Sequence, residues 1–147
     1  MMELQDNNKI NLFSFSFFKF FLAGIVSIIV FTSLYNFLLN PFSQNNQNMT
    51  VIHLSTFKLL RAIFLVPFIE EIIFRWGIQN LFKRLSNSNT VAILFTSLIF
   101  AYVHKDTLFL PYFFNSLVYG FMYMKTGKSL KMPVFLHMTN NLLSFLG

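Results

Sequence analysis

Residues 20–39 read FFLAGIVSIIVFTSLYNFLL, a run of twenty positions without a charged side chain. A helix of about 20 apolar residues is what a hydrocarbon core of about 30 Å requires. The run is long for the apolar part of a signal peptide, and no small-residue cleavage site follows it. We therefore predict a retained transmembrane helix over residues 20–39, preceded by a polar tail from which Lys19 reaches the interface.

The composition of the chain agrees with a lipid environment. Of the 147 residues, 55% are hydrophobic and 11% are charged, whereas a typical soluble domain is about 25% charged. These values exclude a disordered chain and an ordinary water-facing surface. The chain has no cysteine, which excludes a disulfide scaffold.

Four further apolar stretches follow a polar loop that covers residues 40–56. They cover residues 57–82, 91–103, 107–124 and 133–145. Long apolar runs are typical of membrane-spanning helices, whereas membrane strands show short segments of alternating polarity. The sequence therefore predicts an all-α polytopic membrane helix bundle with about five transmembrane helices.

The net charge of +6 comes from basic residues in the tail, in the turns and at the ends of the apolar stretches. The chain lacks the basic stripe with interleaved aromatic residues that is typical of a nucleic-acid-binding surface. With five spans, seven basic residues lie on the side of the N-terminus and three on the other side. The positive-inside rule then predicts a cytoplasmic N-terminus. We expect an integral protein of a bacterial plasma membrane that contacts the lipid bilayer and no nucleic acid.

Three charged residues interrupt the middle of the second apolar stretch, where residues 66–78 read VPFIEEIIFRWGI. Charges at the depth of Glu70, Glu71 and Arg75 are costly, and their default interpretation is function. Glu71 and Arg75 are four residues apart, so they share a helix face and are expected to form a structural ion pair. Glu70 lies about 100° around the helix from Glu71. It keeps no local cation, which suits a general base.

Later apolar stretches add two histidines and an asparagine. His104 ends the third stretch one turn after Phe100, and His137 precedes Asn141 by four residues. This spacing places His137 and Asn141 on one helix face. A lone histidine in a membrane helix is often a packing residue, and His53 in the polar loop is expected to be solvated. The joint occurrence of these groups on three apolar helices predicts a polar site between them.

These residues form three motifs, E-E-x-x-x-R at 70–75, F-x-x-x-H at 100–104 and H-x-x-x-N at 137–141. Their order and spacing resemble the CAAX-protease and bacteriocin-processing family, also called CPBP or Abi, of intramembrane glutamic endopeptidases. One departure is Trp76, because many relatives have a glycine directly after the motif arginine.

The resemblance covers roughly residues 57–147 and implies a four-helix catalytic core there. Residues 1–56 would then hold the tail, the first helix and the polar loop. The resemblance also implies a protease whose substrate is a peptide or a membrane protein, a prenylated CAAX sequence being one option. It implies no cofactor.

The same resemblance assigns roles to the motif residues. Glu70 and His104 would activate a water molecule, and His137 and Asn141 would stabilise the tetrahedral oxyanion. These roles are chemically sensible, since a carboxylate can take and return a proton and N–H donors stabilise negative charge in a dry cavity. The supporting residues are Glu71, Arg75 and Phe100.

Two alternatives stay open. Glu70, His104 and His137 could bind a divalent metal such as zinc and leave one position for water. The spacing is not H-E-x-x-H, however, and Asn141 is not a usual zinc ligand. The protein could instead be a non-catalytic membrane protein that gives bacteriocin self-immunity by binding, as some members of this family are associated with immunity.

Overall fold

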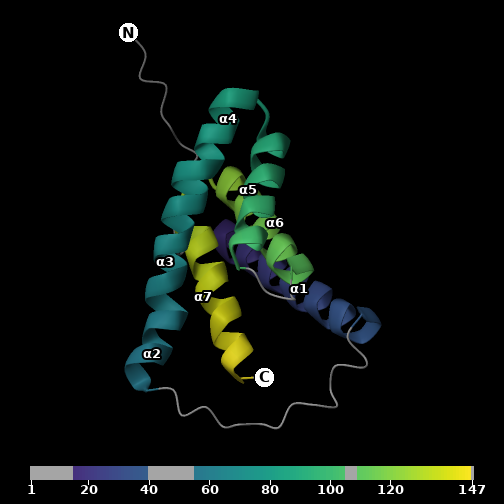
Figure 1. Cartoon of the computed structure of the whole chain (residues 1–147), viewed down its shortest axis with the longest axis vertical. Helices are drawn as coiled ribbons and strands as arrows, with labels where there is room; N and C mark the ends of the chain where they lie inside the picture. The colour runs from purple at the N-terminus through teal and green to yellow at the C-terminus, as the bar shows by residue number, and fades with distance from the viewer. Residues whose placement is uncertain (1–14, 40–54, 105–108, 147) are drawn as a thin grey trace.

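The computed structural model describes residues 15–39, 55–104 and 109–146, and every regular element in these ranges is a helix. Helix α1 covers Phe15–Leu39, α5 covers Asn89–His104, α6 covers Phe109–Lys125 and α7 covers Lys131–Leu146. The described part of the chain is an all-α bundle, which confirms the predicted fold class (Figure 1).

One long helix lies between α1 and α5 and runs without a break from Thr56 to Ser86. Its α-helical parts are α2 (Thr56–Leu60), α3 (Val66–Glu71) and α4 (Asn80–Ser86). Two π-helical segments, Arg61–Leu65 and Ile72–Gln79, join these parts. Such wider turns are rare and often occur at functional sites. Figure 1 shows this helix along the length of the molecule, with α7 beside its lower half.

The apolar stretches locate the helices but not their ends. Helix α1 begins at Phe15 rather than at Phe20, so Lys19 lies inside it, with its Nζ 4.4 Å from the centroid of the Phe15 ring. The long helix continues past Lys83 and Arg84. Lysine and arginine end an apolar run without ending a helix, because both are good helix formers. The predicted loop residues 40–54, with His53, lie outside the described residues.

Left-handed residues end two of the helices and produce the turns that return the chain. After α4, Asn87 has a φ of 53°, and its carbonyl accepts a hydrogen bond from Lys83 Nζ at 2.9 Å. After α6, Gly127 and Lys128 have φ values of 67° and 62°. The Lys128 N–H donates to the Tyr123 carbonyl at 2.8 Å, as in a Schellman-type helix end. The two turns place α5 against α4 and α7 against α6.

Helix α1 packs across α6 and α7 through small and apolar residues. A Cβ atom at Gly24 would lie 2.9 Å from the Leu136 side chain, so glycine permits the close approach of the two helices. The Phe31 ring stacks on Phe114 with 3.9 Å between centroids. Small residues at a helix contact are typical of bundles in membranes, where close packing drives helix association.

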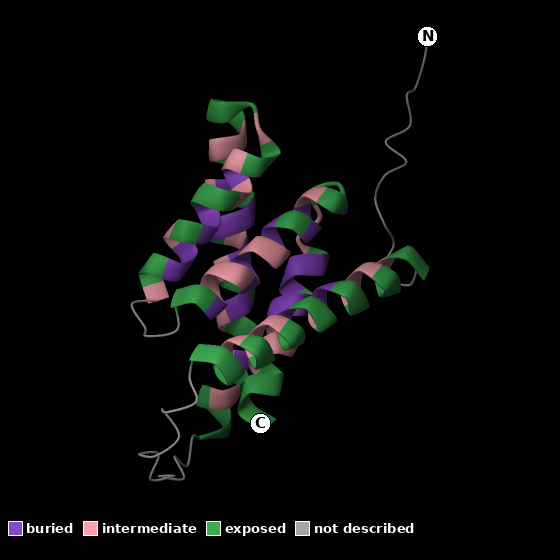
Figure 2. Ribbon diagram, turned by 90° about the vertical axis from the view of Figure 1, so that its right-hand side faces the viewer, coloured by how far each residue is buried: buried purple, intermediate pink, exposed green. Residues whose placement is uncertain are grey.

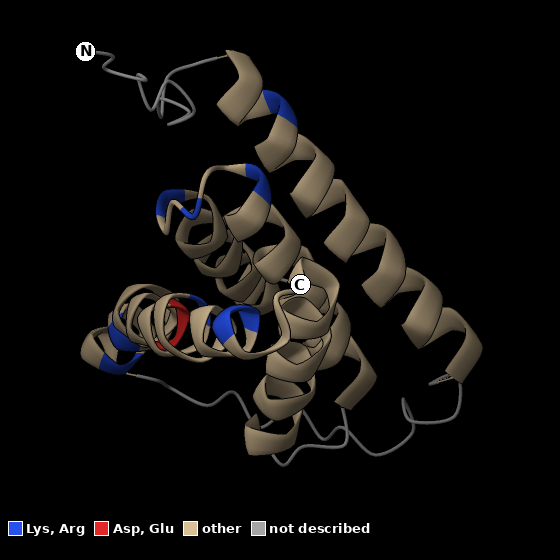
Figure 3. Ribbon diagram, turned by 90° about the horizontal axis from the view of Figure 1, so that it is seen from above, with Lys and Arg blue, Asp and Glu red and all other residues tan. Residues whose placement is uncertain are grey.

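Large apolar side chains cover the outside of the bundle. Phe37, Trp76 and Leu85 are each more than half exposed, whereas the buried residues lie between the helices (Figure 2). By length and composition, α1 is the one helix among the described residues that could cross a membrane, with a mean hydropathy of 2.1, and α5 is a shorter apolar helix. The acidic residues of the described ranges lie on the long helix (Figure 3). An apolar exterior with buried polar groups is consistent with a helical membrane bundle.

Candidate active site

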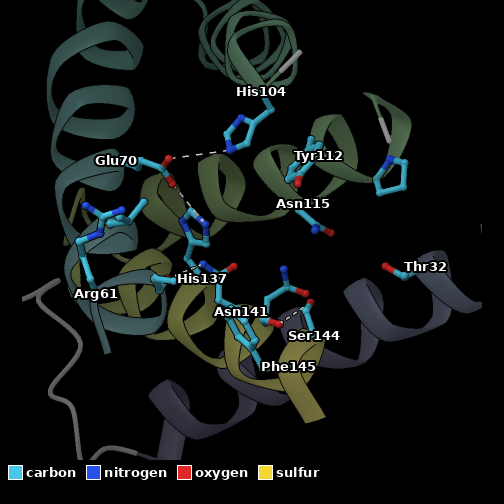
Figure 4. A pocket seen from close by; sticks show the side chains of 14 residues that line it. Thr32, Arg61, Glu70, His104, Tyr112, Asn115, His137, Asn141, Ser144 and Phe145 are labelled. Atoms are coloured by element: carbon cyan, nitrogen blue, oxygen red, sulfur yellow. Dashed lines mark hydrogen bonds and ion pairs between the residues drawn. The ribbon is translucent and has the colours of Figure 1, made fainter. Parts of the chain in front are cut away.

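A cavity of about 370 Å³ lies between the helices, and all four residues predicted as catalytic line it. Glu70 comes from α3, His104 from the last residue of α5, and His137 and Asn141 from α7. Figure 4 shows these side chains directed toward a common space. The fold thus brings together residues from three helices that are far apart in the sequence.

The carboxylate of Glu70 faces both histidines. Its Oε1 lies 3.8 Å from Nε2 of His104, and its Oε2 lies 3.5 Å from Nε2 of His137. These separations are longer than a good hydrogen bond, so the carboxylate and the two rings are close neighbours without a direct hydrogen bond. The Glu70 side chain is 24% exposed, so water can reach it from the cavity.

Each histidine ring is oriented through its Nδ1 atom. His104 Nδ1 lies 2.7 Å from the Phe100 carbonyl, and His137 Nδ1 lies 3.0 Å from Oε1 of Glu71. Carbonyl and carboxylate oxygens only accept hydrogen bonds, so both Nδ1 atoms carry the proton. Both rings therefore present Nε2 to Glu70. The partner of His104 is neutral, whereas the partner of His137 is negatively charged.

Aromatic rings hold the two histidines in place. The buried Phe100 ring lies 4.4 Å from the His104 ring and 5.8 Å from the His137 ring, measured between centroids. Tyr112 stacks on His104 at 4.3 Å, and Tyr119 stacks on His137 at 4.9 Å. The F-x-x-x-H motif therefore supplies both a ring that packs on the site and the carbonyl that fixes His104.

Glu71 and Arg75 form the predicted ion pair, with Arg75 Nε 2.8 Å from Glu71 Oε2 and both side chains fully buried. The same guanidinium donates to Gln79 Oε1 at 3.1 Å and to Ser116 Oγ at 2.7 Å. Gln79 Nε2 in turn donates to the Gly120 carbonyl at 3.0 Å. This buried network connects the long helix to α6, and Glu71 extends it to His137 on α7.

Two residues that complete this network were not predicted from the sequence. Gln79 and Ser116 are fully buried polar side chains inside apolar stretches. The burial of these two side chains could have been inferred from the sequence, because polar residues within membrane helices usually face the bundle interior. Their partners could not be read from spacing, since the hydrogen bonds from Arg75 to Ser116 and from Gln79 to Gly120 each join residues 41 positions apart.

Asn141 is bonded to a backbone carbonyl of the long helix, its Nδ2 donating to the Ala62 oxygen at 3.1 Å. This carbonyl lacks its usual partner for a local reason. The Val66 N–H, which an α-helix would direct to Ala62, bonds to the Arg61 carbonyl in the π-helical segment. Pro67 has no N–H that could replace it. Because Nδ2 carries two N–H groups, Asn141 keeps one further donor.

Two further polar residues line the cavity and were not predicted. Asn115 of α6 is 7% exposed, and its Oδ1 has no hydrogen-bond partner among the described residues. Arg61 lines the cavity from the long helix and is exposed. Figure 4 places Arg61 and Asn115 on different walls of the cavity.

No group of three or more His, Cys, Asp or Glu side chains in the described ranges is arranged so that it could hold a metal ion. Glu70, His104 and His137 do converge, with separations of 3.5 and 3.8 Å from Glu70 to the two rings. The metal-dependent alternative stays a prediction.

Comparison with known proteins gives one family. The family model described as type II CAAX prenyl endopeptidase Rce1-like matches residues 52–143. The matched region runs from before the long helix into α7 and includes every residue of the three motifs. No significant match to a curated protein or to a solved structure was found.

Proposed function

Because the chain belongs to the type II CAAX prenyl endopeptidase Rce1-like family, whose members are membrane-embedded proteases, we propose that its cavity hydrolyses peptide bonds by a glutamate-activated water. The membership confirms the resemblance inferred from the three motifs. The observation that supports the mechanism best is the position of Glu70 between the Nε2 atoms of His104 and His137 on one cavity.

In the proposed first step, a water molecule in the cavity contacts both Glu70 and His104. His104 Nε2 accepts a hydrogen bond from this water, because its own proton is on Nδ1. Glu70 removes a proton while the water oxygen bonds to the carbonyl carbon of the substrate. The carbonyl electron pair moves to oxygen. In the second step, Glu70 returns the proton to the amide nitrogen as the carbon–nitrogen bond breaks.

His137 and Asn141 stabilise the oxyanion in this proposal. His137 can donate from Nε2 only as an imidazolium, since Nδ1 already donates to Glu71. Glu71, which also pairs with Arg75, and Glu70 are the two carboxylates that lie next to that positive charge. Asn141 contributes its second N–H, while the first holds the Ala62 carbonyl. Donors placed before the reaction in a water-poor cavity are the most effective kind of oxyanion stabilisation.

The proposed substrate is a peptide or protein held at the membrane. The name of the matched family points to prenylated CAAX sequences, and these are the first candidates to test. Residues 57–147 would form the catalytic core. We further propose that the protein resides in a bacterial plasma membrane with its N-terminus in the cytoplasm.

The proposal is tested by proteomics of membrane peptides from cells that express the wild type or Glu70→Ala at equal levels. We expect a set of cleaved peptides that disappears in the variant. Identical peptides in both samples would remove the protease assignment. In a bacteriocin challenge, full protection by Glu70→Ala would instead favour the binding-only immunity alternative.

A further inference from the structure

A second cavity, of about 460 Å³, lies between α1 and α7. Helix α1 lies outside residues 52–143, so the family match assigns it no role. Thr32 of α1 and Asn140 of α7 line both the second cavity and the active-site cavity. Figure 4 shows Thr32 directed into the active-site cavity from a helix that carries none of the motif residues. The two cavities therefore meet along these side chains.

One face of α1 is polar where it lines the second cavity. Thr32, Ser33 and Asn36 lie within the uncharged run of residues 20–39 and share a sector of about 100° of the helix. Leu34 and Phe37 lie outside this sector and are 52% and 76% exposed on the apolar exterior. Polar residues of membrane helices usually face the bundle interior or a water-filled cavity. This face of α1 is therefore not suited to contact with lipid.

The lining of the second cavity suits water. In the described part of the chain, the side chains of Thr32, Ser33 and Asn36 have no hydrogen-bond partner, whereas the Ser27 hydroxyl donates to a carbonyl of its own helix. The residues that line this cavity are all uncharged, which favours a neutral ligand over an ion. A water molecule takes about 30 Å³ and bonds to two to four polar groups. The hydroxyl and amide groups of the second cavity can thus hold several water molecules.

The polar face of α1 extends from the active-site cavity toward the end of the helix. Asn36 lies three residues and Thr32 seven residues before Leu39, where α1 ends. At 1.5 Å per residue, the face covers depths of about 5 to 10 Å from that end. The second cavity therefore connects the surroundings of the end of α1 with the active-site cavity at Thr32.

A separate route for water has a clear use in this protein. Hydrolysis consumes one water molecule for each bond that is cleaved. A substrate whose scissile bond lies at Glu70 occupies the active-site cavity of about 370 Å³ and displaces water from it, since cavities of this size bury most of a ligand's surface. Water that arrives past Thr32 approaches from a helix other than the one that carries Glu70.

We propose that the second cavity, between α1 and α7, is a water passage that supplies hydrolytic water to Glu70 while a substrate fills the active-site cavity. This role in supply rests on the proposed function, because hydrolysis is the reaction that consumes the water. The presence of water at Ser33 and Asn36 does not depend on catalysis and can be measured separately.

The chain has no cysteine, so an introduced thiol is the only one in the protein. The test uses the full chain in liposomes with four single substitutions, Ser33→Cys and Asn36→Cys in the passage and Leu34→Cys and Phe37→Cys as their controls. Each control lies one residue further along α1, so its depth differs by about 1.5 Å. All four positions are exposed, so these substitutions should not disturb the packing of the bundle.

The probe is trimethylammonium-ethyl methanethiosulfonate, a charged thiol reagent, present on both sides of the membrane. The thiolate is the form that reacts, and apolar surroundings disfavour it. We expect the thiols at positions 33 and 36 to react at least about tenfold faster than their controls. Equal rates would overturn the passage. Disulfide-linked dimers of Asn36→Cys would also overturn it, because this face of α1 would then be a contact between two copies of the chain.

The role of the passage in supply is tested by cleavage of a farnesylated CAAX-type peptide. The reagent bound at Ser33→Cys should fill the passage and lower kcat about tenfold or more with little change in KM. The reagent bound at Leu34→Cys should change neither constant. Unchanged cleavage by the modified Ser33→Cys protein would overturn the passage as the source of hydrolytic water.

The labelling rates separate this inference from the proposed function. If the wild type cleaves no peptide but the thiols at positions 33 and 36 react faster than their controls, the proposed hydrolysis fails and the water-filled passage stands. If these thiols react no faster than their controls, the passage fails whatever the rate of cleavage.

Discussion

Glu71 accepts a hydrogen bond from His137 Nδ1 at 3.0 Å, across 66 residues of sequence. The adjacent Glu70 faces the other nitrogen of the same ring, with its Oε2 3.5 Å from Nε2. Glu71 is fully buried and paired with Arg75, whereas Glu70 is partly exposed to the cavity. One histidine therefore stands between two consecutive glutamates, of which Glu71 positions the ring and Glu70 is free to react.

The two glutamates should respond differently to the same substitution. Glu71→Gln leaves the Arg75 charge buried without its partner, which should lower the free energy of unfolding by about 3–5 kcal/mol. Glu70→Gln replaces a partly exposed group and should change stability by less than about 1 kcal/mol while abolishing hydrolysis. Unfolding in detergent by heat or by added SDS measures both variants. Equal loss of stability in the two would contradict this division of roles.

The spacing of the motif residues predicts which side chains lie next to each other on one helix of this site. The four-residue spacing of Glu71 and Arg75 predicted an ion pair that the structure contains. The same spacing placed His137 and Asn141 on one face, and both line the cavity. Residues four positions apart are neighbours on any α-helix, so these contacts within one helix can be predicted without knowing the rest of the fold.

Contacts between helices could not be predicted in the same way. The bond from His137 to Glu71 depends on how α7 packs against the long helix, and the turn after α6 sets that packing. The bond from Asn141 to Ala62 depends on a π-helical turn and on Pro67. Neither the turn type nor the position of a π-helical segment follows from an apolar run.

Gly120 should be required for the buried network. A Cβ atom there would lie 2.8 Å from Gln79 Oε1 and 3.1 Å from Arg75 Nη1, and both groups are held by hydrogen bonds. Gly120→Ala should therefore destabilise the protein by about 1–3 kcal/mol and lower activity. Gly77→Ala is the control, because among the described residues the one contact of its Cβ would be the Ile72 carbonyl at 3.8 Å. If Gly120→Ala has the same free energy of unfolding as the wild type, the network is not tightly packed.

Asn141→Ala should lower kcat by about 10²–10³-fold with little change in KM, since it removes an oxyanion donor that acts in the transition state. Ser144→Ala is a suitable control on the next turn of α7, because that hydroxyl donates to the Asn140 carbonyl of its own helix. We expect less than about a threefold effect from Ser144→Ala. Steady-state kinetics that show a raised KM with an unchanged kcat for Asn141→Ala would assign Asn141 to substrate binding.

Removal of divalent metals separates glutamate-based hydrolysis from the metal-dependent alternative. If Glu70 activates water without a metal, prolonged dialysis against EDTA or 1,10-phenanthroline should leave the rate of peptide cleavage unchanged. Loss of activity that added zinc restores would instead support a metal bound by Glu70, His104 and His137. The measurement is the initial cleavage rate before and after dialysis.

The most direct test of the central claim is peptide cleavage by the purified protein in liposomes prepared in H₂¹⁸O, with the products identified by mass spectrometry. The account predicts that the wild type produces a new C-terminal carboxyl group that contains one ¹⁸O atom. It also predicts that Glu70→Gln, folded to the same extent, forms no product. Cleavage by Glu70→Gln at the wild-type rate, or wild-type products without ¹⁸O, would contradict the assignment of Glu70 as the base that activates water.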